Sequence, residues 1–175
     1  MKAFFLSLFV AALFVSCDEG PVGPPGPQGL DGVNVVGQTF EFTADFAAPD
    51  YSAFFSFPNN VQVLNSDVVL AYILWEEAPA NNGGVIDVWR PLPQTVYTAN
   101  SQFAYNYDWT QGDITTFIDA AGNFDFNELT GTDLNNQVFR VVIVPSDFVA
   151  TVDTSNLSEV LSAAGLSTQG IQGLE

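Results

Sequence analysis

From residue 35 onwards, apolar and polar residues alternate in short runs along the chain. In the segment 40–46, apolar residues occupy every second position and polar residues lie between them. This period of two predicts a half-buried β-strand. The segment 68–75 is apolar throughout, which predicts a central strand with both faces buried. The run Glu76-Glu77-Ala78-Pro79 should end that strand.

Turn residues separate further short apolar segments at intervals of roughly ten residues. Asn81-Asn82-Gly83-Gly84 and Asn100-Ser101 each predict a hairpin between the segments that flank them. The other predicted strands are 53–57, 85–89, 95–99, 102–110, 114–118 and 139–144. This pattern predicts an all-β fold, either an antiparallel β-sandwich or a jelly-roll-like domain.

One helix is predicted near the C-terminus, over residues 156–164. Asn156 with Glu159 three residues later resembles a capping box, and Gly165 is a stop signal. An apolar side of Leu157, Val160, Leu161 and Ala164 should cover an edge or an end of a sheet. Residues 167–175 are expected to be frayed.

The first sixteen residues predict a secretory signal, because Lys2 precedes an apolar stretch that is too short to span a membrane. Leu13-Phe14-Val15-Ser16 and then Cys17 resemble a bacterial lipobox. Cys17 is therefore predicted to be lipidated and to become the new N-terminus. The alternative is an ordinary cleaved signal that leaves an unpaired cysteine in an oxidising compartment.

Residues 20–34 carry glycine at every third position, which is a collagen-like pattern. As a single polyproline II strand at ~3.1 Å per residue, this stalk would hold a domain roughly 40 Å from the membrane. The alternative is a triple helix of three chains. Five triplets are few for a triple helix, so a monomer is favoured over a trimer, and crosslinking of the mature protein would separate the two.

Composition narrows the chemistry that the chain can perform. Histidine is absent, and Cys17 is the one cysteine. Without the leader and its Lys2, twenty acidic residues stand against Arg90 and Arg140, a net charge of −18. Such a surface repels nucleic acid and anionic headgroups. Catalytic triads, lysine chemistry and His or Cys metal sites are excluded as well, so we expect no enzyme and no cofactor, calcium aside.

Paired carboxylates are the remaining route to catalysis, because two of them can hydrolyse a glycosidic bond. Glu76 with Glu77, or Asp108 with Asp113, could form such a pair. Neighbouring residues of a strand point to opposite faces, which disfavours the first pair. Among twenty acids some pair can always be chosen, so no enzyme is predicted.

Two segments carry candidate binding residues. The first has aromatic residues at every second position, and its Tyr105, Tyr107 and Trp109 could stack on sugar rings. The alternative is that this aromatic row faces the core, and exposure separates the two. The second is rich in side-chain oxygens, with candidate calcium ligands at Asp119, Asn123, Asp125 and Asn127.

The alternative to a calcium site is an ordinary turn, because Asn, Asp and Gly are also common turn residues. The segment departs from the EF-hand pattern at Glu128 and at Leu134.

Elsewhere, Arg140 lies within a strongly apolar segment, and a lone buried charge is costly. Arg140 is therefore predicted to form a structural salt bridge with a carboxylate that the sequence does not identify.

The chain resembles the small collagen-like lipoproteins of the Bacteroidetes. The resemblance rests on residues 23–29, 31–37, 87–94, 105–108 and 139–145. It implies attachment to the bacterial outer membrane and carries no activity or site residue to transfer. In such bacteria, acidic residues after the lipidated cysteine resemble a signal for surface export. Asp18-Glu19 is a short version, so the cell surface and the periplasmic face both stay open.

The predicted organisation is a signal peptide (1–16), a lipidated N-terminus (17–19), a Gly-X-Y stalk (20–34), a β-domain (35–150) and a C-terminal helix with a tail (151–175). We expect a non-enzymatic envelope lipoprotein with a structural or interaction role and an unidentified protein or glycan partner. The alternative is a glycan- or calcium-binding module on the same scaffold.

Overall fold

The computed structural model describes residues 37–81, 83–167 and 171–173. These residues belong to one compact unit. The predicted signal peptide, the lipidation site at Cys17 and the Gly-X-Y stalk lie outside the described residues. Among the helices that are described, none is both long enough and apolar enough to cross a membrane.

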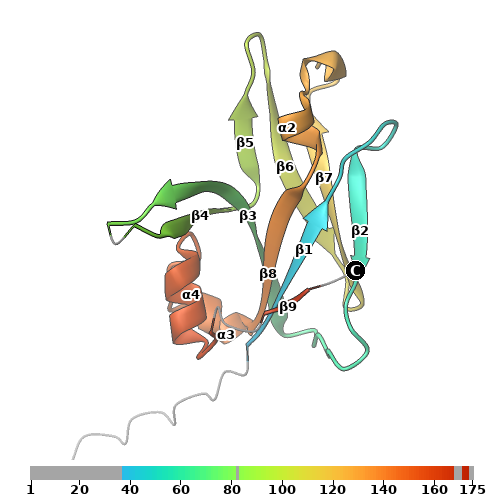
Figure 1. The fold of residues 1–175 in the computed structure, drawn as a ribbon. Coiled ribbons are helices and arrows are strands. Elements are labelled where there is room, and N and C mark those ends of the chain that lie inside the picture. Colours follow the sequence, from blue (N-terminus) through green and yellow to red (C-terminus); the bar gives the residue numbers. More distant parts are fainter. Residues whose placement is uncertain (1–36, 82, 168–170, 174–175) are drawn as a thin grey trace, which may run out of the picture. The chain divides into compact units, whose positions relative to one another are not determined.

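The strands form two sheets that pack face to face, so the predicted all-β sandwich is confirmed (Figure 1). Sheet A has the order β4-β3-β8-β1-β9, and its strands are β4 (Val85–Pro91), β3 (Asp67–Pro79), β8 (Gln137–Pro145), β1 (Gln38–Ala44) and β9 (Gln172–Gly173). Sheet B has the order β2-β7-β6-β5, and its strands are β2 (Ser52–Ser56), β7 (Asp113–Ala120), β6 (Gln102–Trp109) and β5 (Gln94–Tyr97).

Pairing follows two rules. Strands that are close in sequence form the predicted hairpins, β3 with β4 and β5 with β6. Strands that are far apart close the domain, because β1 pairs with β8 in sheet A and β2 pairs with β7 in sheet B. All of these pairs are antiparallel, whereas β9 joins the edge of β1 in parallel. The predicted fraying of the C-terminal residues therefore does not hold for Gln172–Gly173.

An aromatic cluster fills the space between the sheets. The Phe139 ring of β8 stacks on Phe42 with a centroid distance of 5.4 Å and meets the edge of Phe46 at 6.1 Å. Tyr105 reaches Phe139 from sheet B at 6.4 Å, and Phe55 of β2 stacks on Phe42 at 3.9 Å. Aromatic contacts of this kind add to the free energy gained by burial, so these rings join the two sheets.

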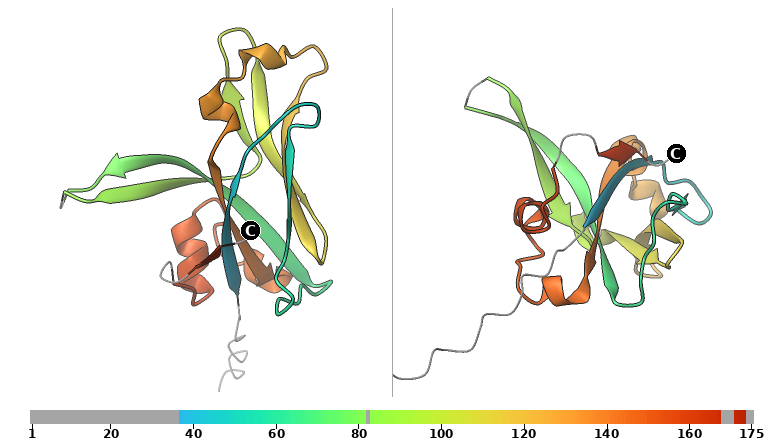
Figure 2. Two further views of the ribbon diagram at one scale, coloured as in Figure 1. Left: turned by 45° about the vertical axis from the view of Figure 1, so that its right-hand side comes forward. Right: turned by 90° about the horizontal axis from the view of Figure 1, so that it is seen from below.

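A second, smaller core covers the outer face of sheet A. Helices α3 (Ser146–Val149) and α4 (Leu157–Ala163) lie against this face (Figure 2). Their apolar side chains pack on Tyr72 of β3 and on Val142 and Val144 of β8. Strand β8 is consequently buried on both faces, from Phe139 through Val144.

The predicted helix is confirmed in its position and in both ends. The Asn156 side chain accepts hydrogen bonds from the backbone N–H groups of Ser158 and Glu159, and Gly165 has a φ of +66°, which favours glycine. The Glu159 carboxylate departs from the capping box and accepts from the Asp153 N–H at 3.3 Å.

The helix covers a face of sheet A, not the predicted edge or end, because the outer sides of β3 and β8 are apolar and need a cover. Among the described residues, three further single-turn helices were not predicted from the sequence. They are η2 (Phe126–Glu128), α2 (Gly131–Leu134) and α3.

Strand β3 runs on to Pro79, beyond its predicted end at Trp75. The register shifts between Leu74 and Glu76, which marks a β-bulge at Trp75. Past the bulge β3 pairs with β4 alone, so Pro79 sits at a free edge where a missing N–H is tolerated. The paired segments 76–79 and 85–88, here called the β3–β4 arm, project beyond the sandwich (Figures 1 and 2).

Phe139→Ala is expected to destabilise the domain by about 3–5 kcal/mol, the usual cost of removing a large buried ring. The measurement is the free energy of unfolding in urea. Phe54→Ala is the matched control, because Phe54 is 62% exposed on β2, and it should change stability by no more than about 0.5 kcal/mol. Equal losses for the two variants would contradict the central place given to Phe139.

Candidate functional site

Arg140 lies in the middle of β8 on the outer face of sheet A and is only 6% exposed. Its neighbour across the β1–β8 pair is Glu41. The Arg140 Nε donates a hydrogen bond to Glu41 Oε1 at 2.7 Å, and Nη2 donates to the same oxygen. The predicted salt bridge of Arg140 is therefore confirmed, and its partner is Glu41.

Trp89 of β4 holds the other side of the guanidinium. The Arg140 Cζ lies 4.1 Å from the centroid of the Trp89 ring, a cation–π contact. Arginine suits this place because its planar group can stack on a ring and pair with a carboxylate at the same time. The Arg140 side chain is thus fixed between Glu41 and Trp89.

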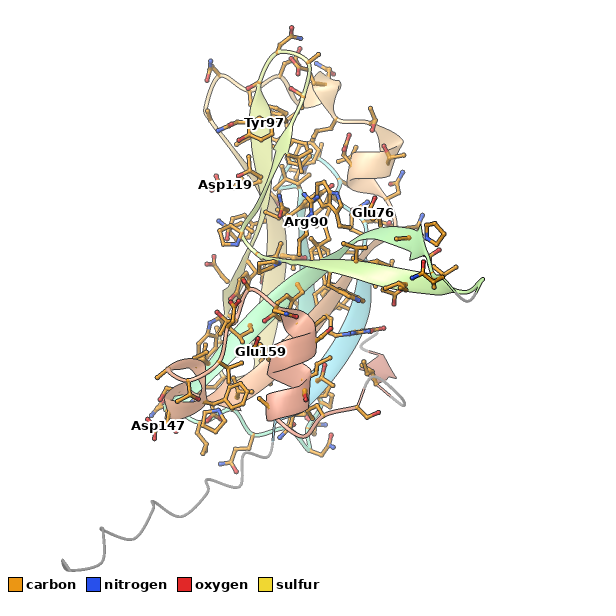
Figure 3. All side chains as sticks on the ribbon, turned by 90° about the vertical axis from the view of Figure 1, so that its left-hand side faces the viewer. Glu76, Arg90, Tyr97, Asp119, Asp147 and Glu159 are labelled. Atoms are coloured by element: carbon orange, nitrogen blue, oxygen red, sulfur yellow. The ribbon has the colours of Figure 1, made fainter. Side chains whose placement is uncertain are left out.

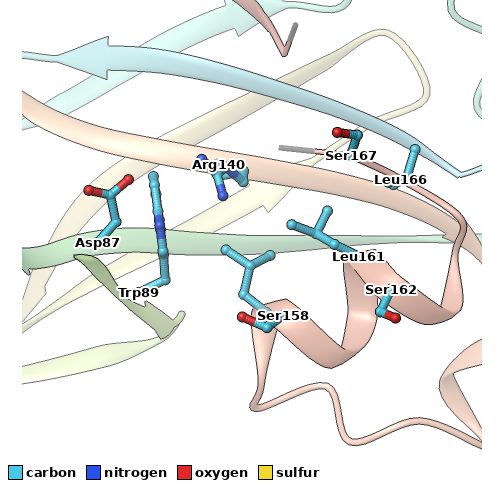
Figure 4. A pocket seen from close by; sticks show the side chains of 9 residues that line it. Asp87, Trp89, Arg140, Ser158, Leu161, Ser162, Leu166 and Ser167 are labelled. Carbon is cyan, nitrogen blue, oxygen red and sulfur yellow. The ribbon is translucent and has the colours of Figure 1, made fainter. Parts of the chain in front are cut away.

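A groove with a volume of about 650 Å³ opens beside this group, between β4 and α4 (Figure 4). We call it the Arg140 groove. Arg140 lies between its two walls, one from the sheet and one from the helix and the segment after it. The lining residues are Asp87, Trp89, Arg140, Leu157, Ser158, Leu161, Ser162, Leu166 and Ser167.

The walls of the Arg140 groove combine polar and apolar groups. Asp87 and Trp89 are two positions apart on β4, so their side chains share one face of the strand. Ser158 and Ser162 are four positions apart on α4, so they share one side of the helix, with Leu161 between them. Such a recess can bind a ligand that has both hydroxyl groups and an apolar face.

The second arginine makes a similar contact elsewhere. The Arg90 Cζ lies 3.9 Å from the centroid of the Trp75 ring, at the β-bulge of β3. Figure 3 shows Arg90 and Glu76 near the base of the β3–β4 arm. The two arginines of the β-domain are therefore both stacked on tryptophans, and Arg140 alone lines the groove.

The aromatic row of β6 mainly faces the core. Tyr105 is 3% exposed, and its hydroxyl donates to the Asp133 carbonyl at 2.7 Å. The Tyr107 hydroxyl donates to the Val69 carbonyl at 2.9 Å, and the ring packs on the inner core. Only Trp109, at the end of the strand, is 38% exposed. The three rings thus do not form one exposed surface on which a sugar could stack.

The predicted calcium segment is held by turn hydrogen bonds. Asp119 is an exposed residue of β7 (Figure 3), and Asn123 lies in the turn that follows. The Asp125 carboxylate caps η2 by accepting from the backbone N–H and the side-chain amide of Asn127. Glu128 accepts from Thr98 and Asn100 across the neighbouring hairpin.

Within residues 37–81, 83–167 and 171–173, no group of three or more His, Cys, Asp or Glu side chains is close enough to hold a metal ion. Calcium at Asp119, Asn123, Asp125 and Asn127 stays a prediction.

The carboxylates of Glu76 and Glu77 lie on the exposed arm, where Glu76 pairs with Val88 and Glu77 with Asp87. Their side chains point to opposite faces, as expected for neighbours in a strand.

Most of the Arg140 groove was missed by sequence reasoning, which singled out Arg140 alone. One local signal was available, since Asp87 and Trp89 alternate on one side of a predicted strand. The serines beside the apolar side of the predicted helix were a second local signal. The sequence pattern around each segment cannot show that the strand and the helix lie side by side, because their residues are about seventy positions apart.

No protein-family model matches the chain, and comparisons with curated proteins and with solved structures give no match either. The resemblance to collagen-like lipoproteins therefore stays a prediction.

Burial raises the pKa of three tyrosines, Tyr72, Tyr105 and Tyr107, above the usual value of about 10. Tyr72 lies in the outer core, and its hydroxyl donates to the Thr154 carbonyl at 2.7 Å. Each of the three hydroxyls, as long as it is protonated, therefore links its strand by a hydrogen bond to a segment distant in the sequence.

Stability should be unaffected by these tyrosines below pH 10 and should fall above it, because the unfolded chain then loses protons that the folded chain keeps. Each tyrosine contributes a slope of up to about 1.4 kcal/mol per pH unit. Urea unfolding at pH 9 and pH 11 measures this effect. Tyr105→Phe should reduce the slope, because it removes one of the three buried hydroxyl groups. An equal stability of the wild-type protein at both pH values would contradict the assignment.

Glu41→Gln is expected to destabilise the domain by about 1–3 kcal/mol, because it leaves the buried Arg140 charge without its partner. The estimate is below that for a fully buried pair because the Glu41 side chain is 32% exposed. Urea unfolding measures the loss, with Glu76→Gln on the exposed arm as the control.

The double replacement Glu41→Leu with Arg140→Met should recover most of that loss, since apolar residues can replace a buried ion pair at little cost. A double variant that is less stable than Glu41→Gln would show that Arg140 contributes more than its pair with Glu41.

Proposed function

We propose that the chain is a non-enzymatic envelope lipoprotein that displays its β-sandwich as an interaction domain. The observation that carries the proposal is the Arg140 groove. Its floor is fixed before any ligand arrives, because Glu41 and Trp89 hold the Arg140 side chain. Its volume of about 650 Å³ falls in the usual range of ligand sites.

The means of attachment is proposed from the sequence. The lipobox that ends at Cys17 would anchor the chain in the outer membrane through acyl chains. The Gly-X-Y stalk of residues 20–34 would then act as a stiff single-stranded spacer. On this proposal the partner is a ligand or protein in the space around the membrane, on the cell surface or on its periplasmic face.

A binding module for glycans is the more specific form of this function, and the groove favours it over calcium. Trp89, Asp87 and the α4 serines offer the ring, carboxylate and hydroxyl groups that sugars use. By comparison, the Asp125 carboxylate of the calcium segment already accepts two hydrogen bonds.

Cys17→Ala should abolish lipidation, because the acylated atom is the cysteine sulfur. In a Bacteroidetes host fed with a labelled fatty acid, the wild-type chain should incorporate the label and enter the detergent phase on Triton X-114 partition. The Cys17→Ala chain should do neither. Ser16→Ala, which keeps a small residue before the cysteine, is the control and should behave like the wild type.

A Cys17→Ala chain that still takes up fatty acid or still partitions with detergent would contradict the anchor. Proteinase K added to intact cells separates the two orientations of the proposal. Loss of the domain on intact cells indicates surface display, and loss only after the outer membrane is opened indicates the periplasmic face.

A further inference from the structure

We infer that the Arg140 groove binds an uncharged glycan, with a sugar ring placed among Trp89, Asp87 and the serines of α4. This inference rests on the proposed function, because it takes the β-sandwich to be a binding domain and names the ligand class of its groove. It concerns a site on the outer face of sheet A, distinct from the aromatic row of β6.

The sheet side of the groove combines an aromatic ring with planar hydrogen-bonding groups. Trp89 has the Arg140 guanidinium 4.1 Å from its ring centroid and Asp87 two positions away on the same strand. A carboxylate such as that of Asp87 can accept two hydrogen bonds side by side. Neighbouring hydroxyls of a sugar ring present this same paired arrangement, and the indole edge supplies an apolar contact.

The helix side of the groove adds groups of matching kind. Ser158 and Ser162 line it from one side of α4, and each hydroxyl can both donate and accept. Leu161 lies between them (Figure 4), and its side chain is buried in the outer core, so it supports this wall from behind. Because Asp87, Ser158 and Ser162 are all exposed, solvent reaches the groove along its length, which suits a chain of sugars.

The floor of the groove is ordered in advance. Arg140 is 6% exposed and is held by Glu41 and Trp89. Long side chains that are already immobilised lose little conformational entropy when a ligand binds. Sugars bind weakly for their size, so this fixed geometry matters for affinity.

Charge selects an uncharged glycan over an acidic one. The Arg140 charge is already compensated by Glu41, and the Asp87 carboxylate lies at the groove. The twenty acidic residues of the chain, against two arginines after the leader, add long-range repulsion of anions. A uronate or a sulfated sugar would meet this negative field without a free cation to pair with in the groove.

The test uses the chain from residue 17 onwards with Cys17→Ala, so that the protein is free of lipid. The probes are soluble neutral glucan, mannan, galactan and xylan, with polygalacturonate and alginate as acidic counterparts. Binding is measured by affinity electrophoresis and calorimetry at 20 mM and 500 mM salt. We expect at least one neutral polysaccharide to bind, with an affinity that changes less than twofold between the two salt concentrations.

Two matched pairs of variants place the binding in the groove. Ser162→Trp should fill the groove and reduce affinity at least tenfold, whereas Ala163→Trp, at the next and exposed position outside the lining, should not. Asp87→Ala should weaken binding at least threefold, whereas Asp50→Ala, in an exposed turn outside the lining, should not. All four positions are exposed, and thermal unfolding verifies that each variant is folded.

The inference is overturned if no neutral polysaccharide binds, or if Ser162→Trp and Ala163→Trp bind equally well. Binding of the acidic polymers alone, weakened by salt, would overturn the assignment to uncharged glycans. These results are independent of the anchor, because lipidation is read from fatty-acid labelling of the full chain and glycan binding from a chain without lipid.

Discussion

Strand β8 lies at the centre of sheet A with apolar side chains on both faces, and each face needs a cover. On the inner face, Phe139 takes part in the aromatic cluster that joins the two sheets. On the outer face, Val142 and Val144 are covered by α3 and α4. The order of layers, helices on sheet A and sheet A on sheet B, follows from this one strand.

Arg140 is the exception on the outer face of β8, and it explains why a groove lies there. A charged group at that depth requires a partner, which Glu41 supplies from the neighbouring strand. Trp89 covers the flat side of the guanidinium from the other direction. The helix α4 packs on the apolar part of the face and leaves the Arg140 groove between itself and β4. The requirement for charge pairing and the limit of the helical cover thus produce the candidate site together.

Local pattern was enough to predict the strands and the ends of the helix. The alternation of residues 40–46 gave β1, the two-sided apolar run gave β3 as a central strand, and Asn156 and Gly165 bounded α4. The pattern could not predict which strand or sheet face each element pairs with or packs against. Strand β3 extends past Glu76 because β4 continues to pair with it, and α4 covers a face because that face is apolar.

The same limit applies to the candidate sites. Alternation placed the β6 aromatics on one side of a strand, and only the packing of the sheets decides that this side is the inner one. The groove joins residues of β4, β8 and α4, and their proximity comes from the tertiary fold. Arg140 was found because a charge inside an apolar run stands out without any knowledge of its neighbours.

The position of Arg140 in the central strand of sheet A has a consequence for proteolysis. The chain has three basic residues, and Lys2 belongs to the predicted leader. Trypsin cuts poorly before proline, and Arg90 is followed by Pro91. The peptide bond after Arg140 lies in the central strand of a covered sheet, so trypsin can reach it only when β8 leaves the sheet. The folded domain should therefore resist trypsin. The rate at which a single cleavage after Arg140 appears would then report how often the whole domain unfolds.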